Sequence, residues 1–141
     1  MANYIEQYYQ AMEDGNIIVS NRVRKQYQKL VQDIKEHPKY VFDDAKANRA
    51  IKFIETFCKH SKGELAGKPL KLALFQRAYV SALFGFVDKE TGYRRYTESF
   101  FFVARKSGKS TMLAAIALYM LMADGESGSE VYSVAVSYTH L

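Results

Sequence analysis

A Gly-Lys-Ser triplet at 108–110 stands between two apolar runs of different character. The run before it, "ESFFFVA" at 98–104, has the aromatic and β-branched composition of a buried strand. The run after it, "TMLAAIALYMLMA" at 111–123, predicts a helix from about 109 to 123 that is apolar almost all round. A strand, a basic loop and a buried helix in this order are the context of a phosphate-binding loop, and they predict a layered α/β domain.

The residues of the triplet suit the chemistry of phosphate binding. Gly108 lets the backbone approach a phosphate, Lys109 supplies the counter-charge, Ser110 offers a hydroxyl on the magnesium side, and Thr111 follows in the first helical turn. The alternative is a basic loop without a ligand, since such a triplet also arises by chance.

The segment before the triplet departs from the general phosphate-loop pattern. Val103 stands where the opening glycine belongs, and a strand one residue longer fits if the small Ala104 follows it. Arg105 and Lys106 are additional cations. Either they neutralise γ-phosphate charge, with Arg105 as a built-in arginine finger, or they face solvent.

The first half of the chain predicts three helices. The first starts near Tyr4 and stops at Gly15, the second is capped by Ser20 or Asn21, and the third starts at Asp43 or Asp44. The buried stripe of the third helix is expected to be Ala50, Ile51, Ile54, Phe57 and Cys58. "HSKGELAGKP" then breaks the pattern, which predicts a helical region at 1–64 and a second domain at 65–141.

Beyond that boundary the sequence predicts a short extended segment and a helix from about Phe75 to Phe84. "DKETGYRRYT" predicts a turn, "DGESGSE" a loop, and "VYSVAV" at 131–136 a second strand.

Composition excludes several classes of site. A single cysteine, Cys58, rules out an internal disulfide, and the three histidines have no metal-ligand spacing. The longest apolar run is shorter than the roughly 18 residues of a membrane span, so we expect a soluble cytoplasmic protein. The net charge of +5 indicates either a polyanionic partner or an ordinary basic surface. The same two alternatives hold for the predicted basic face with Arg24, Lys25, Gln28 and Lys29.

"VARKSGKST" resembles the modified phosphate-binding loop of the large terminase subunits of tailed bacteriophages, the ATP-driven motors that pump DNA into capsids. That loop often lacks the opening glycine and bears a basic residue where Arg105 stands, which accounts for Val103. The resemblance covers about residues 40–136. It includes Lys-Gly-Glu-x-x-Gly-Lys-Pro at 62–69 and Leu-Phe-Gln at 74–76.

The resemblance implies an α/β fold, namely the N-terminal part of a P-loop ATPase domain of the helicase-like, ASCE type, with a parallel sheet between helices. It implies an ATPase that uses ATP and Mg²⁺, with Arg105 and Lys109 as catalytic residues and Ser110 on the metal side. The Gln of the family's Leu-Phe-Gln step recognises adenine, which points to Gln76. Without the resemblance, Gln76 would be interpreted as a helix-capping or surface residue. The implied nucleotide contacts are Gln76, Ala104, Arg105, Lys106, Ser107, Gly108, Lys109, Ser110 and Thr111.

The implied partners are double-stranded DNA, the portal protein and the small terminase subunit. The full-length protein is expected to form a homo-oligomer in the host cytoplasm.

The acids that an ATPase needs after its phosphate loop are not found in their usual place. After Ser110 the acids are Asp124, Glu126 and Glu130, in or beside a loop, and none ends an apolar strand. We therefore expect an N-terminal fragment without the nuclease domain, with a foreign "SYTHL" tail. Such a fragment is expected to be aggregation-prone and to bind nucleotide without useful hydrolysis.

Two other functions remain open on the sequence. One is a different P-loop ATPase, of the helicase-like or AAA type, although the position of Gln76 favours the terminase or helicase-like groups. The other is a non-catalytic DNA-binding module that uses the basic helix at 22–29.

Overall fold

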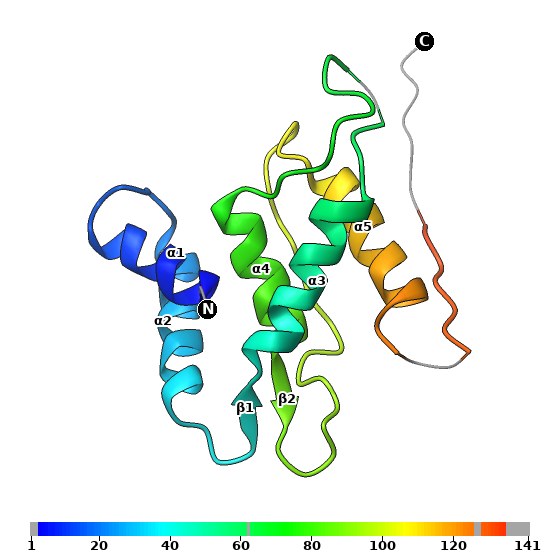
Figure 1. Ribbon diagram of the computed structural model, residues 1–141. Helices are drawn as coiled ribbons and strands as arrows, with labels where there is room; N and C mark the ends of the chain where they lie inside the picture. The colour runs from blue at the N-terminus through cyan, green and yellow to red at the C-terminus, as the bar shows by residue number, and fades with distance from the viewer. Residues whose placement is uncertain (1–2, 62, 126–127, 135–141) are drawn as a thin grey trace.

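The computed structural model describes residues 3–61, 63–125 and 128–134 (Figure 1). In chain order the elements are α1 (Tyr4–Glu13), α2 (Asn21–Lys35), β1 (Tyr40–Phe42), α3 (Asp44–Phe57), α4 (Leu74–Gly85), β2 (Phe86–Asp88) and α5 (Lys109–Met122). Helix α4 packs against both α1 and α3, and α3 also packs against α5. Figure 1 shows α1 and α2 on one side of α4, with α5 on the other side beyond α3. The chain is thus a mixed helix and strand protein with α4 near its centre.

Side-chain caps start the first three helices where the sequence predicts them. The Asn3 carboxamide accepts hydrogen bonds from the amides of Ile5 and Glu6 at 3.1 and 3.3 Å. Ser20 Oγ caps α2, and Asp43 Oδ1 caps α3 by accepting from the Lys46 amide at 3.1 Å. These bonds satisfy amides that lack an intrahelical partner, so the helix starts follow from local sequence alone.

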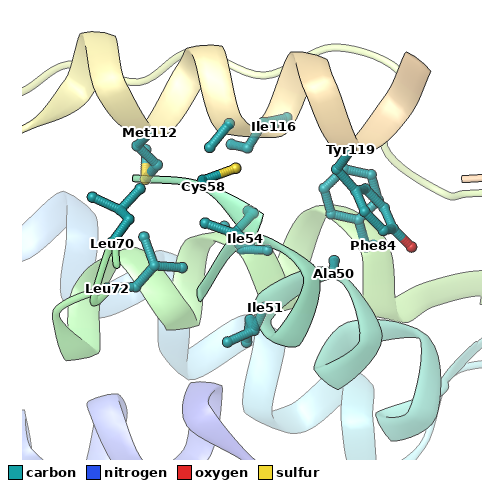
Figure 2. Close-up of a cluster of buried hydrophobic side chains, with 12 residues drawn as sticks. Ala50, Ile51, Ile54, Cys58, Leu70, Leu72, Phe84, Met112, Ile116 and Tyr119 are labelled. Carbon is teal, nitrogen blue, oxygen red and sulfur yellow. The ribbon is translucent and has the colours of Figure 1, made fainter. Parts of the chain in front are cut away.

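The main core lies between α3, α4 and α5, with Leu70 and Leu72 packed beside them (Figure 2). Ile54, Phe84 and Tyr119 come from the three helices in turn, and the Phe84 and Tyr119 rings meet edge to face at 4.9 Å. Cys58 lies in this core as a buried free thiol, and burial raises its pKa. The prediction that Phe57 is buried is wrong. Its side chain is 68% exposed at the last position of α3, where its ring lies against that of Phe53.

Helix α5 is buried on one face only, which corrects the expectation of a helix enclosed on all sides. Its buried residues are Met112, Ala115, Ile116 and Tyr119, at helical spacing. Its exposed apolar residues are Leu113, Leu118, Leu121 and Met122. Within the described part of the chain only one layer covers α5, so the apolar residues on its other face stay in contact with solvent.

A short antiparallel ribbon joins β1 to β2, and the sequence did not predict it. Tyr40 pairs with Asp88 and Phe42 with Phe86, whose rings lie 5.0 Å apart. Gly85 permits this approach, because a Cβ there would overlap the Phe42 ring. The strands are only three residues long, too short for a periodic signal.

The strand predicted at 98–104 does not form. Phe101 and Val103 are half-buried while Phe100 and Phe102 are each 88% exposed, so the side chains alternate as in a strand. No described residue forms a ladder with this segment. The second predicted strand is likewise no strand over 131–134, and its last two residues lie outside the described residues. In Figure 1 the two segments run on opposite sides of α5. A strand requires a hydrogen-bonded neighbour, and neither segment supplies one to the other.

The boundary predicted near residue 64 stays a prediction. Helices on both of its sides pack together, since α4 contacts α1 and α3. None of the described helices is both long enough and apolar enough to cross a bilayer.

Candidate functional site

The loop before α5 has an unusual backbone on both sides of Ser107. Lys106 and Gly108 adopt left-handed conformations with φ of 63° and 71°, and Lys106 is the one non-glycine residue with positive φ in the described segments. Such a conformation costs a residue with a Cβ roughly 1–2 kcal/mol. Alternating helical and left-handed residues turn successive amides toward one side, which is the geometry of an anion-binding loop.

Helix α5 begins without a side-chain cap. Gly108 is the N-cap residue, and its carbonyl accepts the first helical hydrogen bond from the Met112 amide at 3.0 Å. The amides of the first turn, at Lys109, Ser110 and Thr111, donate no hydrogen bond to a capping side chain. Uncapped amides and the helix dipole together attract an anion at this end of the helix.

Three cationic residues lie in the loop and at the first position of α5, next to these amides in the chain. Arg105, Lys106 and Lys109 are exposed, and none of them forms an ion pair with a carboxylate in the described part of the chain. The Ser110 side chain is exposed, and those of Ser107 and Thr111 are half-buried. The loop therefore presents donors and positive charge to solvent, as a polyphosphate requires.

Gln76 connects this loop to the amino end of α4. Its side chain is buried, with 9% of its surface exposed, and its Nε2 donates to the Ser107 carbonyl at 3.3 Å. Its Oε1 accepts from the Ala73 amide at 2.9 Å, which caps the first turn of α4. Figure 1 shows α4 and α5 starting at the same end of the molecule. The fold thus brings Gln76 to the loop from 31 positions upstream of Ser107.

Two residues that the sequence analysis missed hold the segment before α4. Glu55 Oε1 accepts from the Leu72 amide at 3.2 Å and from Arg77 Nε at 2.9 Å. The Arg77 guanidinium also lies 5.2 Å from the Tyr4 ring of α1. These contacts join α1, α3 and α4. No local sequence pattern predicts them, because the partners of Glu55 lie 17 and 22 positions away.

The described acids that follow Ser110 lie away from the loop. Asp124 pairs with Arg94 at 3.2 Å beyond the far end of α5, a helix of 14 residues and hence about 21 Å long. Glu130 accepts a hydrogen bond from the Tyr132 hydroxyl at 2.5 Å, and Glu126 lies outside the described residues. No cluster of three or more His, Cys, Asp or Glu side chains that suits a metal ion occurs in the described ranges.

A separate cavity of about 640 Å³ lies between α2, α4 and the 96–103 segment. Its lining is rich in aromatic side chains and includes Tyr8, Tyr27, Tyr79, Phe75 and Phe101. Burial raises the pKa of Tyr27, so this hydroxyl stays neutral. The cavity lies beneath the segment that leads into the loop, since Val103 is one of its lining residues.

Comparison with known proteins gives consistent matches. Residues 74–140 match the sequence model of the family described as "Terminase large subunit, ATPase domain". The chain is 32% identical over 93 residues to the terminase large subunit of Enterobacteria phage HK97, which is 65% of this chain and 17% of that protein. It is 26% identical over 139 residues to the terminase large subunits of Lactococcus phages p2 and SK1, which is 96% of this chain and 25% of each of those proteins. The chain spans a quarter or less of the length of these relatives. No solved structure matches significantly.

Proposed function

We propose that the loop at 104–111 and the start of α5 form the ATP-binding site of a DNA-packaging motor, because residues 74–140 match the terminase ATPase family and the similar proteins are phage terminase large subunits. The observation that carries this proposal is the uncapped amino end of α5 behind left-handed Gly108, with three cations beside it that lack carboxylate partners among the described residues. This arrangement fits a triphosphate, which needs many donors and a surplus of positive charge.

Each side chain of the loop has a role in this proposal. Lys109 neutralises the terminal phosphates, and Arg105 stabilises the charge that develops during phosphoryl transfer. Ser110 offers its hydroxyl to Mg²⁺, which when bound would supply charge neutralisation between phosphate oxygens. Ala104, Lys106, Ser107, Gly108 and Thr111 complete the loop around the phosphates, chiefly through their backbone amides.

Gln76 is proposed to contact the adenine base. A carboxamide offers one donor and one acceptor to the N6 and N7 edge of adenine. Both ends of the Gln76 amide already hold a backbone partner, but Nε2 has a second hydrogen and Oε1 a second lone pair. Contact with the base would use that remaining capacity.

The finer fold and the wider partners are part of the same proposal. We assign residues 65–141 to the beginning of a P-loop domain of the ASCE type, preceded by a helical region at 1–64. For the full-length protein we propose DNA translocation powered by ATP hydrolysis, double-stranded DNA as the substrate, and the portal protein and small subunit as partners. A homo-oligomer in the host cytoplasm completes the proposal. The match to the terminase ATPase family and the similarity to phage terminase large subunits support these assignments.

The test is equilibrium titration with a fluorescent ATP analogue. Lys109→Ala is expected to weaken binding at least about tenfold, because it removes the cation next to the phosphates. Lys52→Ala is the matched control, since Lys52 is exposed on α3 and loses the same charge. Equal affinity of the wild-type chain and Lys109→Ala would refute the site. Loss of binding in both variants would show that net charge, not the loop, attracts the nucleotide.

A further inference from the structure

Gln76 forms a hydrogen bond with the peptide group of the loop that joins Ser107 to Gly108. A peptide unit is planar, and in the trans form its C=O and N–H point in opposite directions. The described chain contains no cis peptide. Since the Ser107 carbonyl points toward Gln76 Nε2, the Gly108 N–H points away from α4.

This peptide lies where the backbone is least constrained by regular structure. Ser107 lies between left-handed Lys106 and left-handed Gly108, and no helical hydrogen bond holds its carbonyl. Gly108 tolerates either orientation, because it has no Cβ. A Cβ at Gly108 would lie 3.2 Å from Gln76 Nε2, so the side-chain amide also depends on glycine for its close approach. Without the bond to Gln76, rotation of this peptide would turn its carbonyl oxygen toward the side of the loop where a phosphate would bind.

Gln76 itself is rigidly held. Its Oε1 is fixed by the Ala73 amide, and the neighbouring Leu72 amide is fixed by Glu55. Arg77, the next residue of α4, is tied to Glu55 at 2.8 Å. The buried amide is therefore a fixed point on the helical part of the molecule, and the loop is attached to it.

We infer that Gln76 is a positioning residue for the phosphate loop: it orients the Ser107–Gly108 peptide so that the Gly108 amide faces the open side, where a polyphosphate binds. This inference rests on the proposed nucleotide site, and it adds to the proposed contact with adenine. The two roles make different predictions for a ligand without a base. A contact with adenine matters only for ATP, whereas a correctly oriented amide matters equally for inorganic tripolyphosphate.

The first measurement needs no ligand. Gln76→Met keeps the size of the side chain and removes its amide, and Gln28→Met makes the same change at an exposed position of α2. In isotope-labelled protein, Gln76→Met is expected to shift the carbonyl carbon of Ser107 and the amide of Gly108, and Gln28→Met is expected to leave both in place. Should Gln76→Met fail to fold, Gln76→Glu has nearly the same shape, retains an acceptor for the Ala73 amide and replaces the donor to Ser107 with a carboxylate oxygen. Unchanged signals at Ser107 and Gly108 in the folded variant would overturn the inference.

The second measurement is titration with ATP and with inorganic tripolyphosphate. Gln76→Met is expected to weaken tripolyphosphate binding by about 2- to 10-fold, the effect of one hydrogen bond, and ATP binding by at least as much. Unchanged affinity for tripolyphosphate together with weakened ATP binding would leave the base contact as the sole role and refute the positioning role. If the wild-type chain binds neither ligand, the proposed function fails, and the signals of Ser107 and Gly108 then decide the positioning role by themselves.

Discussion

The first segment, residues 3–97, and the second segment, residues 98–134, differ in how completely their side chains are buried or hydrogen-bonded within the described chain. In the first segment Ile5, Ile54 and Phe86 are fully buried, and side-chain caps start α1, α2 and α3. In the second segment Phe100 and Phe102 are 88% exposed, and α5 starts without a cap. The residues proposed to bind nucleotide lie mostly in the second segment. The first segment is therefore stabilised by its own buried side chains and helix caps, whereas the second leaves donors, cations and apolar side chains available to other groups.

The largest expected effect compares two phenylalanines. Phe86 is fully buried against Ile5 and Leu30, so Phe86→Ala is expected to lower the free energy of unfolding by about 3–5 kcal/mol. Phe102→Ala is expected to change it by less than about 0.5 kcal/mol, because the ring is exposed. Urea unfolding followed by circular dichroism measures both. Similar losses in the two variants would mean that the 98–104 segment is packed in solution, which would contradict the difference in burial between the two segments.

An intermediate effect is expected from two ion pairs. Asp33 and Arg95 lie 2.7 Å apart inside the first segment, each side chain 13% exposed, and the Arg95 guanidinium packs between the Tyr40 and Tyr96 rings. Asp33→Ala leaves that guanidinium unpaired, at an expected cost of about 2–3 kcal/mol.

Asp124 provides the contrast, because its pair with Arg94 ties the end of α5 to the first segment. Asp124→Ala is expected to cost about 1 kcal/mol, since the pair is more exposed and its distance is 3.2 Å. Thermal unfolding measures both variants. A larger cost at Asp124 than at Asp33 would show that α5 is integrated into the core as firmly as α2.

The smallest expected effect is a pH dependence within the first segment. The Asp88 carboxylate accepts hydrogen bonds from the amides of Thr91 and Glu90 at 3.0 and 2.8 Å, and these bonds lower its pKa. A lowered pKa in the folded state adds stability above the ordinary carboxyl pKa, and that stability is lost as the pH falls through the lowered value. We expect Asp88→Asn to flatten the acid limb of a melting temperature profile recorded from about pH 5 to pH 2. An unchanged acid limb would show that the turn after β2 does not hold the carboxylate in solution.

Local sequence predicted the helices well and the site only in part. The sequence offered Ser20 or Asn21 as the cap of α2 and Asp43 or Asp44 for the start of α3, and in the structure Ser20 and Asp43 are the caps. The start of α5 at Lys109 is also confirmed. For Gln76, the residues alone indicated a helix-capping or surface residue, and the structure shows the cap with the side chain buried. Its approach to Ser107 could not be derived from spacing, because it depends on how α4 and the loop are placed in space.

The errors lie where an element needs a distant partner. "ESFFFVA" has the composition of a strand and alternates in exposure like one, but no described residue pairs with it. The β1–β2 ribbon, in contrast, has no periodic signal and forms because α3 and α4 bring its strands together. Strand formation is decided by pairing, which composition cannot report.

Local sequence accounts for the helix starts, the left-handed turn at Gly108, the run of cations and the match to the terminase ATPase family. Each of these depends on neighbouring residues or on a short motif. Three features depend on tertiary packing: the hydrogen bond from Gln76 to the loop, the buried face of α5 and the pairing of β1 with β2. These two groups of features differ because the hydrogen-bond partners of a cap or a turn lie within a few residues, whereas those of a buried amide or a strand lie on distant segments that must first pack together.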